Sequence, residues 1–107
     1  MKITVTKEAL EEIKSVAERE KIKNPAVYLD LGKSCCGSVP KVEVVEQTPG
    51  GSEMLDNANG IPFFACDLIK KFFKENEERN DLQLKVDLIM PYGLSFQILE
   101  TSNINSP

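Results

Sequence analysis

Apolar residues recur at helical spacing in two parts of the chain. Over residues 9–17, apolar positions lie three or four apart with charged residues between them, so one helix face is apolar and the other solvated. Thr6 precedes this run and can cap it, and Asn24-Pro25 is expected to end it, because proline disfavours helical dihedral angles in the preceding residue. A second helix is predicted to begin with Asp67 as its cap, since apolar pairs four residues apart follow over 68–73.

Alternation of apolar and polar positions predicts β-strands in the rest of the chain. The clearest cases are residues 26–32, 39–47, 82–88 and 94–98, and shorter strands are expected at 3–5 and 60–65. Pro62 lacks a backbone N–H, so the last of these is expected at a sheet edge, or with Pro62 at its start. The turns between most strands are too short for repeated parallel crossovers, which favours antiparallel or mixed sheets.

Small and polar residues separate these elements. Residues 33–38 contain two serines, two cysteines and a glycine, and are predicted to form a loop that interrupts the strands. Residues 48–59 are predicted to form a long polar connection, and residues 101–107 a flexible polar tail. We therefore expect a single domain over residues 1–100 followed by that tail.

The composition and net charge of the chain limit the kinds of partner that it can bind. The chain has 107 residues, 41% of them hydrophobic, which suits one self-supporting domain. Thirteen basic and 17 acidic residues give a net charge of −4, which disfavours binding to nucleic acid or an anionic membrane. Neither a membrane-spanning run nor a signal peptide is apparent, so we expect a soluble cytoplasmic protein.

The chain contains no histidine. This removes the commonest general base near neutral pH and the commonest ligand of transition metals. Serine and cysteine hydrolases that rely on a histidine are excluded within this chain, as are zinc sites of mixed cysteine and histidine ligands. Thiols, carboxylates, lysines and backbone groups must carry any chemistry.

Three cysteines are the main candidates: Cys35, Cys36 and Cys66. In an irregular loop both neighbouring thiols can face outward, backbone N–H groups of Ser34 and Gly37 can stabilise a thiolate, and Lys33 can supply a cation. Free cysteines are often simply buried, but a polar loop with a glycine is a poor place to bury two. Cys66 follows an apolar strand, where a packed core cysteine, a third ligand and a resolving thiol are all open.

Ligand number limits what these thiols can hold. Structural zinc and iron–sulfur clusters normally take four ligands, whereas one chain offers at most three thiolates. A complete site would form between subunits or keep an open position, which suits a transient carrier. Adjacent cysteines can instead form a strained, easily reduced disulfide, which keeps a redox role open.

Several separated stretches together resemble the HesB/IscA-like iron–sulfur biosynthesis domain, also called the A-type carrier family. The matching stretches are residues 3–9, the strand Val27-Tyr28-Leu29-Asp30-Leu31-Gly32 followed by Ser34-Cys35-Cys36-Gly37, Gly60-Ile61, Val86-Asp87, and Gly93-Leu94-Ser95-Phe96. Their order and spacing, which span residues 3–99, carry the resemblance. It implies a β-rich α+β fold: a pseudo-barrel or sandwich of mixed, mostly antiparallel strands with two peripheral helices.

The resemblance also implies dimeric or tetrameric assembly, for which we expect a homodimer, and binding of iron or an iron–sulfur cluster through three cysteines. Iron–sulfur assembly proteins are the partners it implies. Cys36 matches the family's first cysteine, with Cys35 as an extra neighbour. The family's C-terminal Cys-Gly-Cys element has no counterpart here, because no cysteine follows Cys66. The pair looks like a divergent branch with a Cys-Cys motif, in which selenocysteine can replace one cysteine.

The first hypothesis is therefore a HesB-like protein that binds iron, a cluster or another soft metal through Cys35 and Cys36, with Cys66 as a further candidate ligand. Two alternatives stay open: a thiol redox protein that uses the vicinal pair, and a non-catalytic scaffold that keeps the fold.

Overall fold

The computed structural model describes residues 1–34, 37–47 and 54–100. Its elements follow the order β1 (Lys2–Val5), α1 (Lys7–Arg19), β2 (Pro25–Ser34), β3 (Gly37–Glu46), β4 (Asp56–Ala58), β5 (Ile61–Ala65), α2 (Asp67–Glu75), β6 (Leu82–Ile89) and β7 (Gly93–Glu100). The strands predicted from alternation are confirmed. The predicted polar connection additionally contains the short strand β4, which pairs with β5.

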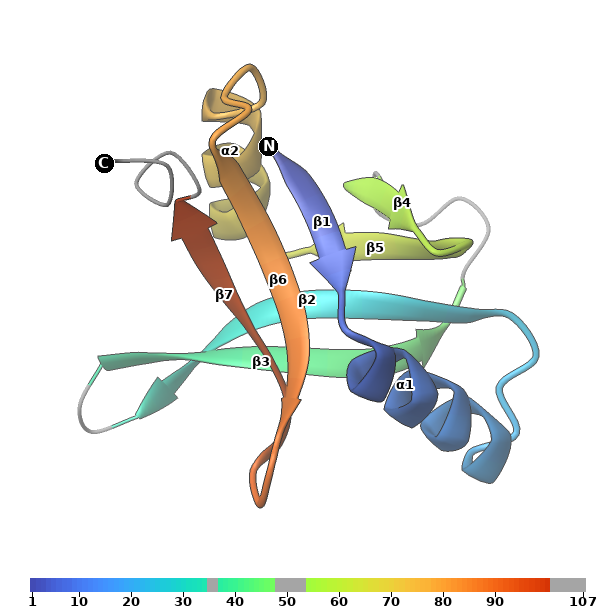
Figure 1. The fold of residues 1–107 in the computed structure, drawn as a ribbon. Helices are drawn as coiled ribbons and strands as arrows, with labels where there is room; N and C mark the ends of the chain where they lie inside the picture. Colours follow the sequence, from blue (N-terminus) through green and yellow to red (C-terminus); the bar gives the residue numbers. More distant parts are fainter. Residues whose placement is uncertain (35–36, 48–53, 101–107) are drawn as a thin grey trace.

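The strands form two sheets that cross steeply (Figure 1). One sheet has the order β1-β6-β7 and the other β3-β2-β5-β4. The pairs β2–β3, β4–β5 and β6–β7 are antiparallel, whereas β1–β6 and β2–β5 are parallel. The expected α+β fold of mixed, mostly antiparallel strands with two outlying helices is thus confirmed, in the form of two sheets rather than a closed barrel.

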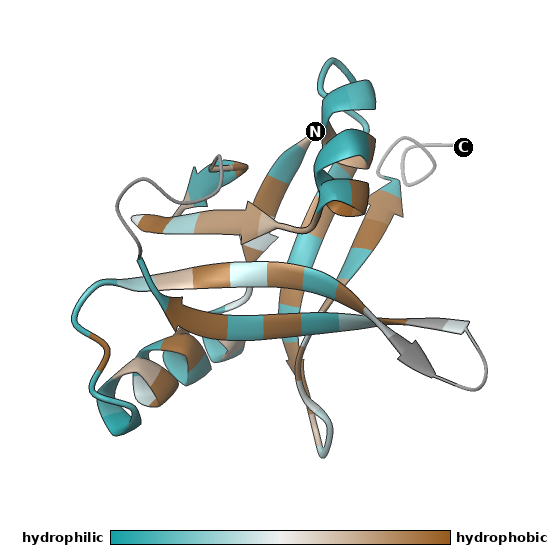
Figure 2. Cartoon of the chain, turned by 180° about the vertical axis from the view of Figure 1, so that it is seen from behind, coloured by the Kyte–Doolittle hydropathy of each residue, from teal (hydrophilic) through white to brown (hydrophobic). Residues whose placement is uncertain are grey.

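The hydrophobic core fills the space between the two sheets and the inner faces of the helices. Alternating brown and teal bands along the strands show that each sheet turns one apolar face inward (Figure 2). The largest fully buried side chains are those of Phe63, Ile13, Leu29, Leu84, Val27 and Val86. Because these residues come from both sheets and from α1, one core joins the two sheets and this helix.

Helix α1 starts as predicted but ends earlier. The Thr6 hydroxyl accepts a hydrogen bond from the Ala9 N–H at 3.2 Å, which makes Thr6 the N-cap. The helix stops at Arg19 rather than running to Asn24, because Lys21 takes a φ of 58° and the Ile22 N–H donates to the Ala17 carbonyl at 2.7 Å. This bond satisfies a carbonyl at the helix end without a glycine.

Two further details correct the sequence-based expectations. Cys66, not Asp67, is the N-cap of α2, and its side chain makes no capping hydrogen bond. Strand β5 lies inside its sheet, between β2 and β4, so it is not an edge strand. Pro62 is tolerated because pairing of β5 with β2 begins only at Phe63, the next residue.

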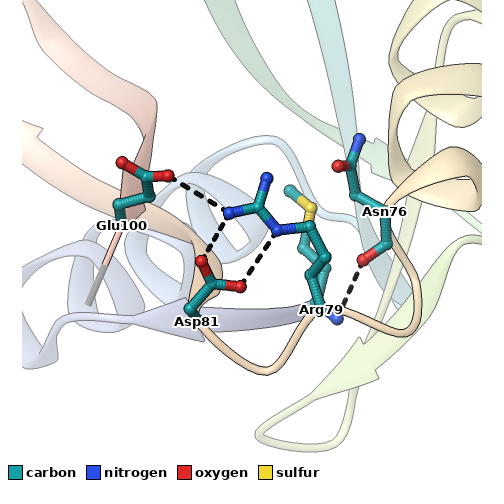
Figure 3. Close-up of polar contacts among 5 residues, drawn as sticks. Asn76, Arg79, Asp81 and Glu100 are labelled. Carbon is teal, nitrogen blue, oxygen red and sulfur yellow. Dashed lines mark hydrogen bonds and ion pairs between the residues drawn. The ribbon is translucent and has the colours of Figure 1, made fainter. Parts of the chain in front are cut away.

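The end of β7 is tied to the start of β6 by a polar cluster (Figure 3). The Arg79 guanidinium donates to both carboxylate oxygens of Asp81 and, at 3.1 Å, to Glu100. The Arg79 N–H also donates to the Asn76 carbonyl at 3.0 Å, which closes the turn after α2.

Neither helix in the described part of the chain is long and apolar enough to cross a membrane.

Candidate functional site

The cysteine pair connects the two strands of a long hairpin. Strands β2 and β3 are paired over their whole length, from Pro25↔Glu46 to Ser34↔Gly37. The predicted loop over residues 33–38 is therefore wrong at its ends, since Lys33 and Ser34 belong to β2 and Gly37 begins β3. Cys35 and Cys36 themselves lie outside the described residues.

Gly37 provides the backbone freedom that this short connection needs. Its φ of 123° is one that residues with a Cβ rarely adopt, and the position is exposed. The strands can therefore stay paired as far as Ser34 and Gly37 without a longer loop. The residue types predict an interruption of the strands here, but they do not show that strand pairing continues as far as Gly37.

Lys41 brings a cation toward the end of the hairpin. Lys41 pairs with Asp30, yet its aliphatic chain leans diagonally over Gly32: a Cβ built on Gly32 would lie 2.9 Å from Lys41 Cε and 3.1 Å from Cδ. Gly32 is two residues nearer to Ser34 than Asp30 is. The aliphatic chain of Lys41 thus occupies space that any side chain at position 32 would fill. The position of this lysine near the end of the hairpin could not be predicted from the sequence, because it depends on the strand register.

Cys66 lies at the junction of β5 and α2. Its N–H donates to the Leu29 carbonyl at 3.0 Å, and its carbonyl accepts from the Lys70 N–H at 2.9 Å. The side chain is half-buried against the hydrophobic core, and the thiol is free. These contacts agree with the interpretation of Cys66 as a packed cysteine and leave part of its surface accessible.

Cys66 and the end of the hairpin are well separated within one chain. Leu29 pairs with Ala65 in parallel register, so Cys66 lies beside the next residue of β2, Asp30. Ser34 is four residues further along β2, and at about 3.3 Å per residue this corresponds to about 13 Å. Ligands of one cluster need sulfurs within about 4–7 Å of each other. The role of Cys66 as a further ligand beside Cys35 and Cys36 therefore stays a prediction, and it applies to a site that two chains share.

The surface around Cys66 carries charges of both signs. On the outer face of β2 and β3, Tyr28 pairs with Glu43 and Asp30 with Lys41. Asp67, the first residue of α2, lies 3.6 Å from the Lys70 ammonium. Partial burial, followed by the nearby carboxylate of Asp30, raises the pKa of the Tyr28 phenol. The phenol therefore stays protonated throughout the physiological pH range.

The described residues do not form a metal centre of their own. No group of three or more cysteine, aspartate, glutamate or histidine side chains is arranged to hold a metal ion among residues 1–34, 37–47 and 54–100.

No protein-family model matches the chain, and no curated protein is significantly similar to it in sequence. Solved structures are similar in fold. A protein from Aquifex aeolicus, determined by solution NMR, aligns with a TM-score of 0.57 at 22% identity, over 90% of this chain and 88% of that one. A crystal structure of IscA with its [2Fe-2S] cluster aligns with a TM-score of 0.52 at 15% identity, over 92% of this chain and 84% of IscA. These similarities establish an IscA-like fold.

Proposed function

We propose that this protein is a non-enzymatic member of the iron–sulfur assembly machinery that binds iron, an iron–sulfur cluster or another soft metal ion through Cys35 and Cys36. The observation that carries the proposal is the combination of an IscA-like fold with a hairpin whose strands are joined by two adjacent cysteines. Thiolates select soft metals and iron–sulfur clusters over hard cations. The metal or cluster is cargo, acquired from one assembly protein and passed to another.

Ligand number makes a second copy part of the proposal. One chain offers two adjacent thiolates, whereas a [2Fe-2S] cluster takes four. Two hairpins, one from each copy in a homodimer, provide four thiolates. Cys66 of either copy is a further candidate ligand across the dimer. In this arrangement the ammonium group of Lys41, whose aliphatic chain leans over Gly32 toward the end of the hairpin, offsets part of the negative charge of the thiolates.

The test is anaerobic reconstitution with ferrous iron and sulfide, followed by visible absorption and by iron and sulfide analysis. The wild type should bind about one iron and one sulfide per chain, because a [2Fe-2S] cluster would be shared by two chains. The double variant Cys35→Ser/Cys36→Ser should lose the absorption and the iron. Cys66→Ser should keep both if the two hairpins alone supply the ligands, and a loss of iron in this variant would assign Cys66 to the site. If the wild type and the double variant bind equal amounts of iron, the proposal is wrong.

A redox role is the second candidate, favoured because Cys66 lies beside Asp30, four residues along β2 from Ser34, where the described part of this strand ends. In this case Cys35 and Cys36 lose two electrons and two protons to an oxidised thiol–disulfide partner and form a disulfide, which a dithiol then reduces. Thiol trapping and mass measurement in defined glutathione buffers test this role. Three free thiols in every buffer exclude it, and a chain active in neither experiment is a scaffold.

A further inference from the structure

Strand β7 is the last strand of its sheet and has one open edge. Within residues 1–34, 37–47 and 54–100, β7 pairs with β6 alone. Every second residue of β7 therefore directs its backbone N–H and C=O away from β6, toward the side on which helix α2 lies (Figure 1). An open edge of this kind is a template for one further strand.

An apolar groove runs along this edge, between β7 and α2. It has a volume of about 390 Å³ and is lined by Leu31, Phe96 and Ile98 together with one side of α2. No described residue of β6 lines it, so it lies on the open side of β7. A strand added to β7 would lie about 4.8 Å from it, within this groove. An α-helix is about 10 Å across and cannot pair with a strand edge, so the groove favours an extended occupant. We refer to it as the α2–β7 groove.

The side of α2 that lines the groove exposes apolar side chains at a spacing that suits a strand. Leu68 is 63% exposed and Phe72 is 40% exposed, and one turn of helix, about 6 Å, separates them. Side chains on one face of a strand repeat at about 6.8 Å. Two apolar residues of a bound strand, two positions apart, can therefore contact Leu68 and Phe72 together. Adjacent exposed apolar side chains of this kind mark an interaction site.

Two charged residues distinguish the ends of the groove. Glu75 lies beyond Phe72, at the end of α2, and Lys71 lies one turn before Glu75, nearer to Leu68. A basic residue of a bound segment is therefore attracted at the Glu75 end and repelled at the Leu68 end.

We propose that the α2–β7 groove binds an extended segment of a partner protein, which adds to the open edge of β7 as an antiparallel strand. Antiparallel pairs are the more stable per residue. Because α2 and β7 run in the same direction (Figure 1), the segment runs against both. Its inward residues are then a basic residue opposite Glu75 and two apolar residues opposite Phe72 and Leu68, with one polar residue between each. Backbone hydrogen bonds supply affinity, and the inward side chains supply specificity.

The probe is the fluorescently labelled peptide Lys-Thr-Val-Thr-Ile-Thr-amide, titrated with the full chain and followed by fluorescence anisotropy. The dissociation constant should be about 10–100 μM. Leu68→Ser should raise it at least about tenfold. Met90→Ser is the matched control, because Met90 is 75% exposed but lies in the turn between β6 and β7, outside the groove, and should not change it. Circular dichroism confirms that each variant is folded.

Two further comparisons test the pattern of the segment. The peptide Lys-Val-Ile-Thr-Thr-Thr-amide has the same composition without the alternation and should bind at least about tenfold more weakly, which excludes general attraction to a chain of net charge −4. Glu75→Lys should weaken binding of the first peptide and should strengthen binding of the same peptide with glutamate in place of lysine.

Hydrogen exchange of the backbone amides tests the strand pairing itself. Within Phe96–Glu100, the amides that point away from β6 should exchange more slowly when the peptide is bound, while the amides bonded to β6 should change little. Binding without slower exchange in β7 would mean another mode, such as a docked helix, and would overturn the inference.

Three other results would also overturn the inference: no binding of the probe up to about 1 mM, equal binding by Leu68→Ser and the wild type, or binding that appears only in Ile104→Ser. The last result would make the chain's own residues 101–107, in which Ile104 is the one large apolar residue, the occupant of the groove. The inference does not depend on metal binding by the cysteines, so Leu68→Ser should bind as much iron as the wild type.

Discussion

Asp87 of β6 connects the β6–β7 hairpin to Thr6, the N-cap of α1, through one side-chain hydrogen bond. The Thr6 hydroxyl donates to Asp87 Oδ1 at 2.9 Å, and the Leu88 N–H donates to the same oxygen at 2.8 Å. The hydrogen bond from Thr6, followed by that from Leu88, lowers the pKa of the Asp87 carboxyl. The ionised carboxylate is therefore favoured by the folded state.

This contact predicts a specific pH dependence of stability. A lowered pKa in the folded state contributes stability that is complete above the unfolded value of about 3.9 and is lost as the pH falls through the folded value. Asp87→Asn should therefore lower the melting temperature at pH 7 and make a smaller difference at pH 3, as measured by thermal circular dichroism. Thr6→Ser keeps the hydroxyl and should behave as the wild type. An equal difference at both pH values would contradict the prediction.

At the scale of elements, we expect strand β5 to contribute strongly to the stability of the larger sheet. It is paired on both edges, and Phe63 at its centre is fully buried. Phe63→Ala should lower the free energy of unfolding by about 3–5 kcal/mol, because it removes a large side chain and leaves a cavity. Phe72→Ala on α2, where the ring is 40% exposed, is the matched control and should cost about 1 kcal/mol or less. Urea unfolding of the monomer measures both, and similar losses would show that β5 is not central.

Elements were predictable where a local pattern determines them. Alternation identified β2, β3, β6 and β7, and the Thr6 cap located the start of α1. The ends were less predictable, because the end of α1 depends on a positive φ at Lys21, a residue with no marked preference for it. The hairpin likewise stays paired to Gly37 because one backbone angle permits it, which the residue types alone did not reveal.

At the scale of the whole molecule, the two sheets share one core and should unfold together. Val27 lies in one sheet and Leu84 in the other, and both are fully buried in the same cluster. Their backbone amides should therefore exchange hydrogen with equal free energies, which match the global free energy of unfolding from urea titration. Native-state exchange followed by NMR measures this. A clearly lower value for either amide would show that one sheet opens independently.

The arrangement of the sheets and of the candidate site depends on distant pairings. Alternation shows which face of a strand is apolar, but not that β1 joins β6 or that β2 joins β5 in parallel. The second of these pairings determines where Cys66 lies relative to Ser34. The sequence could therefore name the three cysteines, whereas the position of Cys66 beside Asp30 of β2 required the fold.

The parallel pairing of β1 with β6 also determines when the protein can fold during synthesis. Lys2–Val5 find their partners only in residues 83–86. Strand β1 therefore stays unpaired until about 80 further residues have been made, which takes several seconds at about 5–20 residues per second. During this interval its edge is open to other nascent chains, so a chaperone that shields the first residues should raise the yield of folded protein.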